Sequence, residues 1–369
     1  MNEPIFIARQ DTLEQEILPA HWLAQYKLFG EESYTFQDKG IWKKLCMSSA
    51  AANDRDIHAE ALEEMLTTFS AEHTGKWMLL VYGMDAAALE GLATMAAIAA
   101  NGTAMGAIAD NALLMHAIAN SETAMQRIAN SQTAMQRVAN NRGAMDAIGR
   151  SRIARDAVQA SPYYNSYIKE NDMAIAKLVV GFANLESAGY SGCAGMAADS
   201  TAMTAVAASS TAMTAVAASS TAMTAVAASG VALKAIAQAY KNTANMLQFL
   251  KAVNASDTLI KRIYNTLTNA TALFGASQLG AQDGVADANS WATTSAAPNA
   301  FLACACGYYN SGGASVDVTY NGTAIAQNKT GTRQPGSVTS TNVNAITMAP
   351  STFTENGDGW LAVQKFTVK

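Results

Sequence analysis

Apolar residues recur every ten positions over much of the chain and mark two repeat arrays. In the first array, methionine occupies every tenth position from Met95 to Met145, and isoleucine or valine follows three residues after each one. In the second, the decapeptide Ser-Thr-Ala-Met-Thr-Ala-Val-Ala-Ala-Ser occurs three times without change over residues 200–229. Such exact repetition indicates that each unit makes the same contacts as its neighbours. The apolar positions expected to form this repeated core are Met105, Ile108, Met125, Ile128, Met135, Val138, Met203, Val206, Met213, Val216, Met223 and Val226.

Polar pairs such as Asn130-Ser131 and Asn140-Asn141 separate the repeats of the first array. Asparagine tolerates the left-handed conformation that ends many helices, and serine or asparagine caps the amides that begin the next one. Each decapeptide is therefore predicted to form a short helix of about two turns. One continuous helix is disfavoured, because a ten-residue period would turn the apolar stripe by roughly 80° per repeat. A β-solenoid is the alternative for these rungs, although alanine and methionine favour helix.

The C-terminal part changes to a β pattern. Residues 315–320 alternate between apolar and polar side chains, and Asn321-Gly322 then supplies the residues of a tight hairpin turn. Residues 301–306 and 360–368 are further predicted strands. These segments predict a small β-sandwich.

The predicted fold is multidomain α+β, with a mostly α globular head at the N-terminus, a central solenoid-like stack of short helices and a C-terminal β-sandwich. The head holds three of the five tryptophans and an amphipathic stripe over residues 57–69. Between the two arrays, Pro162 and a glycine-rich turn interrupt the repeat and indicate an irregular joint. The expected boundaries are 1–85 for the head, 86–160 for the first array, 161–198 for an irregular joint, 199–279 for the second array with capping helices, 280–290 for a linker and 291–369 for the β-domain.

Composition narrows the range of functions. The net charge of −5 argues against a surface that binds nucleic acid, and only 14% of the residues are charged. No apolar run approaches the roughly 20 residues of a membrane span, so membrane insertion is not expected. The start of the chain does not resemble a signal peptide. Four scattered cysteines do not suggest a disulfide framework, and Cys304 and Cys306 are expected to be small buried residues.

The sequence offers little catalytic chemistry. It has no zinc-protease helix motif, no phosphate-binding loop, no nucleophile elbow and no paired Cys-x-x-Cys, so no catalytic residue, cofactor or metal ligand is assigned. A non-enzymatic role is therefore expected, with an enzyme site in residues 1–85 as an alternative. Regular threonines in the second array raise ice binding as another alternative, but the first array replaces them with Gln126, Gln136 or Asp146. A possible binding loop contains Tyr308, Tyr309 and Asn310, because aromatic side chains at a loop tip can stack on sugars.

The phrases at 120–126 and 130–136, Asn-Ser-Glu-Thr-Ala-Met-Gln and Asn-Ser-Gln-Thr-Ala-Met-Gln, resemble alanine-rich decapeptide arrays of tailed-bacteriophage virion proteins, chiefly tail-fibre or head-fibre components. The resemblance covers residues 91–150 and 199–236. It implies a structural part of a virion, assembled in the host cytoplasm, whose head docks on the particle. It also implies other virion proteins as partners and a host receptor or cell-surface glycan as the target of the β-domain. Thin arrays with apolar edges suggest a homo-oligomer. The alternative from a different class is a free-standing adhesion or carbohydrate-binding repeat protein.

Overall fold

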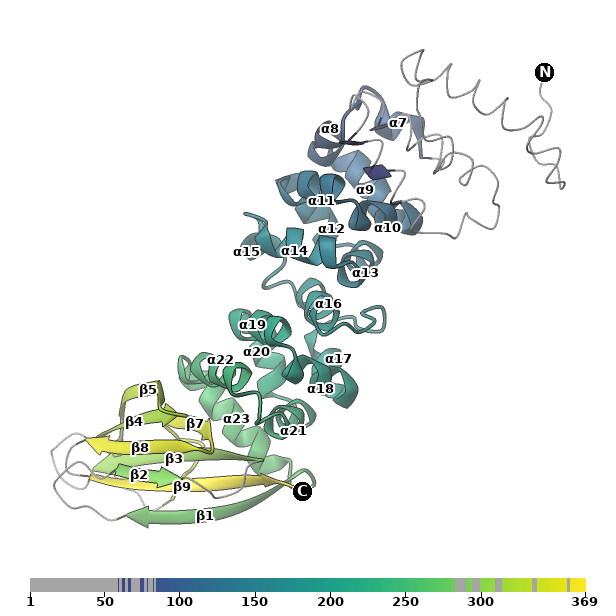
Figure 1. Ribbon diagram of the computed structural model, residues 1–369. Helices are drawn as coiled ribbons and strands as arrows, with labels where there is room; N and C mark the ends of the chain where they lie inside the picture. The colour runs from purple at the N-terminus through teal and green to yellow at the C-terminus, as the bar shows by residue number, and fades with distance from the viewer. Residues whose placement is uncertain are drawn as a thin grey trace, which may run out of the picture. The chain divides into compact units, whose positions relative to one another are not determined.

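The computed structural model describes residues 84–282, 290–293, 299–308, 314–333, 337–356 and 359–369, with isolated positions between 59 and 82 (Figure 1). The predicted head of residues 1–85 lies almost entirely outside the described residues. Contacts divide the chain into two units, residues 1–168 and residues 169–369. Helices precede two antiparallel sheets along the chain, so the predicted mixed α and β composition is confirmed.

In unit 1, each decapeptide forms one short helix. The helices are α7 (Ala86–Leu89), α8 (Met95–Ala100), α9 (Gly102–Asp110), α10 (Ala112–Asn120), α11 (Glu122–Ala129), α12 (Gln132–Ala139), α13 (Arg142–Arg150), α14 (Arg152–Ala160) and α15 (Tyr164–Tyr167). Serine, threonine, aspartate or asparagine begins each helix from α7 to α14, and its side chain accepts a hydrogen bond from a backbone N–H of the first turn. These caps explain why one ten-residue unit produces one helix.

The helix ends differ from the predicted left-handed form. Asn130 has φ −92° and ψ 4°, and Asn140 has φ −96° and ψ 0°. The side-chain amides instead donate to carbonyls one turn back, Asn130 to Gln126 and Asn140 to Gln136, each at 2.9 Å. These bonds satisfy carbonyls that the last turn leaves without a helical partner, so a left-handed residue is not needed.

Unit 2 begins with helices of the same kind. They are α16 (Asp172–Phe182), α17 (Cys193–Ala198), α18 (Ser200–Ala208), α19 (Ser210–Ala218), α20 (Ser220–Ala227), α21 (Gly230–Gln238), α22 (Thr243–Asn254) and α23 (Asp257–Asn269). The segment predicted as an irregular joint, residues 161–198, is more regular than expected. It contains α15, α16 and α17, and α16 stacks on α19 just as the repeat helices stack on one another. Asn171 caps α16 by accepting a hydrogen bond from the Ala174 amide, although this segment does not have the decapeptide sequence.

Helices α8 to α11 in unit 1 and α16 to α20 in unit 2 each pack on the third helix that follows. In unit 1, α9 contacts α12, α10 contacts α13 and α11 contacts α14; in unit 2, α17 contacts α20 and α18 contacts α21. The chain bends by 102° between α18 and α19 and by 94° between α20 and α21. Bends of this size return the chain to the same side after about three helices. A residue therefore lies near the equivalent residue of the repeat three units away.

The strands of unit 2 form two sheets. They are β1 (Phe274–Gln282), β2 (Ser290–Thr293), β3 (Ala300–Tyr308), β4 (Ser315–Tyr320), β5 (Thr323–Thr330), β6 (Thr332–Arg333), β7 (Ala345–Met348), β8 (Ser351–Asn356) and β9 (Gly359–Val368). One sheet has the order β1-β9-β3-β6, with β7 also paired to β3, and the other has the order β2-β8-β4-β5. All pairings are antiparallel except the short one between β3 and β6. Asn321, with φ 46°, and Gly322, with φ 75°, make the predicted hairpin turn between β4 and β5.

The first strand starts earlier than the sequence indicates. Residues up to 279 were expected to be array and capping helices, followed by a linker over 280–290, yet β1 begins at Phe274. This strand pairs with β9 from Phe274↔Val368 to Gln282↔Leu361. The polar, glycine-containing segment lacks the alternation of an ordinary strand, and pairing with the apolar β9 determines its conformation.

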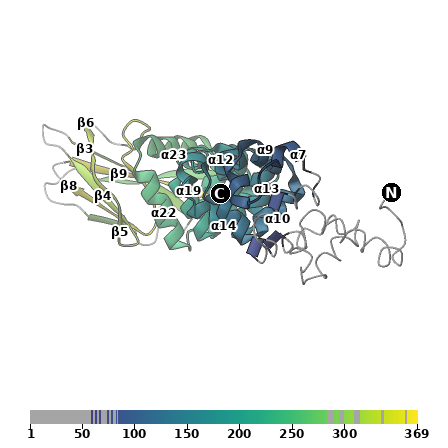
Figure 2. The ribbon, with the colours of Figure 1, turned by 90° about the horizontal axis from the view of Figure 1, so that it is seen from above.

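The last helices of unit 2 pack on its strands (Figure 2). Helix α22 contacts β5 and β7, and α23 contacts β1 and β7. The Asn254 side chain bonds both backbone groups of Ile346, accepting at 3.0 Å and donating at 2.7 Å. Tyr264 meets Phe366 edge to face with ring centroids 5.7 Å apart. These contacts cover the end of the repeat stack with β-structure, because the last helices would otherwise expose an apolar face.

Candidate functional site

The predicted repeat-core residues lie in the interior of the helical stacks. Methionine and isoleucine or valine of each repeat face those of the repeats stacked on it, and alanines between them let the helices approach closely. All twelve are at most 1% exposed: Met105, Ile108, Met125, Ile128, Met135, Val138, Met203, Val206, Met213, Val216, Met223 and Val226. Their arrangement supplies an apolar interior and brings no polar groups together, so these residues support the stack rather than a reaction centre.

Serine hydroxyls join repeats that are stacked on one another. Each such serine donates to a carbonyl 32 residues earlier, at the end of another helix, and Ser131, Ser151 and Ser229 also cap the helix that they begin. These bonds are Ser131 to Ala99 at 2.6 Å, Ser151 to Ala119 at 2.5 Å, Ser161 to Ala129 at 2.5 Å and Ser229 to Ala197 at 2.6 Å. The sequence predicted the cap but not the second bond, because the spacing of 32 residues follows only from the three-helix turn.

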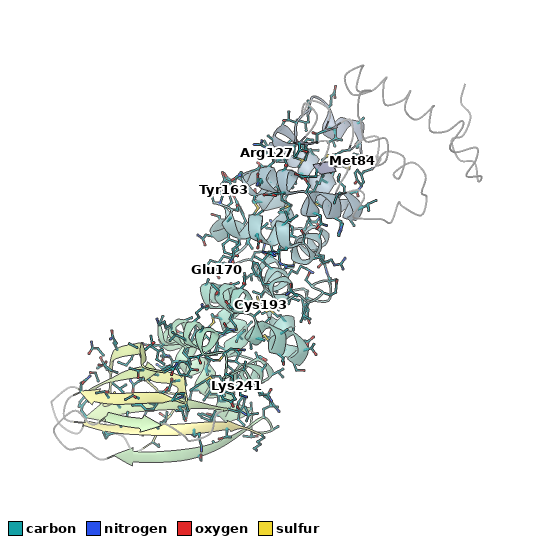
Figure 3. The ribbon with its side chains drawn as sticks, in the orientation of Figure 1. Met84, Arg127, Tyr163, Glu170, Cys193 and Lys241 are labelled. Atoms are coloured by element: carbon teal, nitrogen blue, oxygen red, sulfur yellow. The ribbon has the colours of Figure 1, made fainter. Side chains whose placement is uncertain are left out.

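Two glutamates that lie outside the repeats accept hydrogen bonds at the N-termini of repeat helices. In unit 2, Glu170 accepts from the backbone N–H of Ser220 at 3.1 Å and of Thr221 at 3.0 Å, and from both hydroxyls (Figure 3). In unit 1, Glu63 accepts from the Ser121 hydroxyl and from the amide and hydroxyl of Thr123 at the start of α11. A carboxylate at a helix N-terminus is stabilised by the free amides and the helix dipole. Neither contact is predictable from the sequence, since nothing in the spacing links residues 50 or 60 positions apart.

Hydrogen bonding sets the ionisation of Glu170. Partial burial alone would raise the pKa of this carboxyl, but the bonds from Ser220 and Thr221 favour the charged form and lower the pKa below its ordinary value. At neutral pH, Glu170 is therefore a charged group that accepts hydrogen bonds at the start of α20. These hydrogen bonds fix the start of α20 and therefore have a structural effect.

The described cysteines are buried free thiols. Cys193 lies at the start of α17, where its backbone N–H donates to Asp172 Oδ1 at 2.9 Å (Figure 3). Burial, followed by the nearby Asp172 charge, raises the pKa of Cys193. Cys304 and Cys306 are fully buried in β3, and burial raises the pKa of Cys304 as well. Thiols held protonated in this way are poor nucleophiles, consistent with the predicted packing role.

The possible binding loop is described only at its first residue. Tyr308 ends β3 and is partly buried, while Tyr309 and Asn310 lie outside the described residues. Trp360 and Tyr320 are 1% and 2% exposed and belong to the interior of the β-structure. Neither ring is available to a ligand in this conformation.

The threonines of the second array do not form one flat face. Because α18 and α19 meet at a bend of 102°, Thr201 and Thr211 point in different directions around the stack. The repeat three units further along the chain, which stacks on α18, has Val231 and Lys234 in place of Thr201 and Thr204. The threonines therefore do not continue along one side of the stack. A flat threonine surface is what ice binding would require, so the geometry offers no support for that alternative.

Among the described residues, no group of three or more His, Cys, Asp or Glu side chains is placed to hold a metal ion. No single described helix combines the length and apolarity of a membrane span, although two bent pairs, α18 with α19 and α20 with α21, satisfy the criterion jointly.

Comparison with known proteins does not assign the chain to a class. No family model matches the sequence, and no curated protein shows significant similarity to it. The function must therefore be argued from the repeat geometry and from the surfaces of the two units.

Proposed function

We propose that the chain is a non-enzymatic structural component of a phage particle, as a fibre, tail or head appendage. In this proposal the short helices form a solenoid-like stack that spaces a C-terminal β-sandwich, and the sandwich binds the host surface or a partner protein. The head of residues 1–85 would dock on the particle.

The observation that carries the proposal is the repetition of one contact along the chain. Ser131, Ser151, Ser161 and Ser229 each bond a carbonyl 32 residues earlier, and the methionines between them are buried in the same way. A stack built from one repeated contact can lengthen without changing its cross-section. This property suits a spacer, whereas catalysis requires unlike groups that converge on one point.

The contacts between the two sheets support the β-sandwich. Strand β4 of one sheet contacts β3 and β7 of the other, and β8 contacts β9. Phe301 and Phe366 of one sheet, and Phe353 and Tyr320 of the other, have side chains exposed by no more than 2%. Two sheets with apolar residues buried between them are the defining feature of a sandwich.

The resemblance of the decapeptides to those of phage virion proteins supports the proposed role in a phage particle. The resemblance implies a virion protein that is assembled in the host cytoplasm and has other virion proteins as partners. A homo-oligomer is expected because appendages follow the symmetry of the particle. Size-exclusion chromatography with light scattering tests this point, and a monodisperse monomer at micromolar concentration would contradict it.

The decisive experiment is quantitative mass spectrometry of purified phage particles from cells that produce this chain. The proposal predicts the chain in the particle fraction at several copies per particle, at a constant ratio to the major capsid protein across a density gradient. Recovery only in the soluble or cell-surface fraction would contradict the proposal. That result would favour the second candidate, a free-standing adhesion or carbohydrate-binding repeat protein, which the polar groove of unit 2 described next also supports.

A further inference from the structure

An open groove of about 660 Å³ lies in unit 2 between α23 and the junction of α20 with α21. One wall consists of polar side chains from a single face of α23. The other wall consists of small residues, so no large side chain crosses the groove. The residues that line it are Ala228, Gly230, Thr258, Lys261, Arg262, Asn265, Thr266, Asn269 and Ala270.

The packing of α23 explains why this face is polar. Ile260, Ile263 and Leu267 are buried against the rest of unit 2. The residues on the other side of the helix, at spacings of three and four, therefore face solvent and the groove. Thr258, Lys261, Arg262, Asn265 and Asn269 are all exposed.

The charge of the groove is positive and is not neutralised within the described part of the chain. Lys261 and Arg262 form no ion pair or hydrogen bond with any described residue, and no carboxylate lines the groove. The one acidic residue of α23, Asp257, is paired with Lys329 at 3.0 Å. Two adjacent cations are thus available to an anionic group of a ligand.

The remaining lining groups define the rest of the ligand. The amides of Asn265 and Asn269 and the hydroxyl of Thr258 can donate and accept hydrogen bonds, as the hydroxyl groups of a sugar require. Alanine is the largest apolar residue in the lining, so an acidic peptide would find no pocket for its side chains. The lining also has no aromatic ring on which a neutral sugar would stack.

We propose that this groove binds an acidic saccharide. Lys261 and Arg262 would bind its carboxylate, phosphate or sulfate group, with Asn265, Asn269 and Thr258 at its hydroxyls. This inference rests on the proposed function, because it specifies the chemistry of the host surface that unit 2 would bind. It also moves the recognition surface from the aromatic loop after β3 to the helices that precede the sheets.

The test is isothermal titration of the full chain with an oligogalacturonate of defined length. Matched titrations use a neutral maltooligosaccharide of equal length, inorganic phosphate and a short DNA oligonucleotide. We expect saturable binding of the oligogalacturonate that weakens as salt increases, and no binding of the neutral sugar. No detectable binding of the oligogalacturonate up to about 10 mM would overturn the proposal. Equal or tighter binding of phosphate or DNA would overturn the assignment to a saccharide.

Three variants locate the site. Lys261→Gln with Arg262→Gln should weaken oligogalacturonate binding at least about tenfold, because both charge-assisted bonds are lost. Lys241→Gln with Lys251→Gln changes the net charge equally at exposed positions outside the groove and should leave the affinity within about twofold. Ala228→Trp should abolish binding without a change of charge, since it fills the groove from the opposite wall.

Equal weakening by the two double variants, or unchanged binding in Ala228→Trp, would show diffuse attraction instead of a site. Circular dichroism of each variant checks that the fold is retained, which the exposure of all five positions predicts. Particle mass spectrometry and these titrations use different observables. A chain absent from particles that still binds the oligogalacturonate would contradict the virion role alone, and the reverse result would contradict the groove alone.

Discussion

The hydroxyl of Ser229 donates to the carbonyl of Ala197 at 2.6 Å, and the two residues are 32 positions apart. The same oxygen accepts from the Ala232 backbone N–H at 3.2 Å. One small side chain therefore caps the start of α21 and supplies a partner for the end of α17. The serines at 131, 151 and 161 bond a carbonyl 32 residues earlier in the same way.

Substitution of Ser229 by alanine should remove both bonds. We expect the free energy of unfolding to fall by about 2 kcal/mol, about 1 for the lost cap and about 1 for the unpaired carbonyl. Urea unfolding followed by circular dichroism measures the change. Ser210→Ala is the matched control, because Ser210 is exposed in the first turn of α19 and its side chain makes no cap there. Equal effects of the two substitutions would contradict the double role of Ser229.

The carboxylate of Glu170 should make stability depend on pH. Burial raises its pKa, but the stronger combined effect of the bonds from Ser220 and Thr221 lowers it below the unfolded value of about 4.3. The carboxylate therefore adds stability that is complete above about pH 4.3 and is lost as the pH falls through the lower folded value.

Glu170→Gln tests this pH dependence. At pH 7 the variant should be less stable than the wild type by about 0.5–1 kcal/mol, as for a partly exposed charge at a helix N-terminus. The difference should shrink as the pH falls below about 4. Thermal unfolding across the pH range gives the comparison, with the exposed Glu90→Gln as control. The pH 3 end of this range is about one unit below the unfolded pKa. A stability difference between variant and wild type that stays constant down to pH 3 would argue against stabilisation by the ionised carboxylate.

Gly307 in β3 allows the Trp360 indole to lie directly against the strand backbone. The two residues are paired across β3 and β9, and a Cβ at position 307 would lie 2.2 Å from Trp360 Nε1. Gly307→Ala should therefore destabilise the β-structure by about 3 kcal/mol, as overpacking of a buried site does. Gly275→Ala in β1 is the control. Its added Cβ would meet its nearest neighbour, Lys369 Cε, at 3.6 Å, and the change in stability should be less than about 1 kcal/mol. Tryptophan fluorescence during unfolding distinguishes the two variants.

The buried methionine of a central repeat should be important for the stack. Met213 is 0% exposed in α19, which packs between α16 and α22. Met213→Ala should cost about 2–5 kcal/mol because it leaves a cavity, whereas Met213→Leu keeps the volume and should cost less than about 1.5 kcal/mol. Differential scanning calorimetry measures both. If alanine and leucine were tolerated equally, the interior of the stack would be too loose to act as a spacer.

The local features of the fold follow from the sequence, and the long-range ones do not. The period of Met203, Met213 and Met223 and the polar punctuation predicted both the helices and their buried faces. The packing of each helix on the third one after it depends on the bends at the junctions, which no single decapeptide encodes visibly. The same reason applies to Glu170 and Ser220, which meet only because the chain returns to the same side.

The strands and surfaces were predicted less completely. Alternation identified β4, but Phe274 begins a strand in a polar, glycine-containing segment whose conformation depends on pairing with β9. The groove residues Lys261, Arg262 and Asn265 could have been noticed as a polar stripe at helical spacing. Their placement opposite Ala228 depends on tertiary packing, so the stripe alone would have indicated only a solvated face.

The bends of 102° between α18 and α19 and of 94° between α20 and α21 indicate what additional repeats would do to unit 2. Because the decapeptides of 200–229 are identical, inserting another copy among them would present each neighbour with the contacts it already makes. One extra copy would, however, rotate the sheets about the stack axis relative to α16. Because these helices pack on the third one after them, three extra copies would return the sheets to nearly their original direction. Changes in the length of this array should therefore be tolerated in any number by folding, but preferentially in threes wherever the sheets must face a fixed direction.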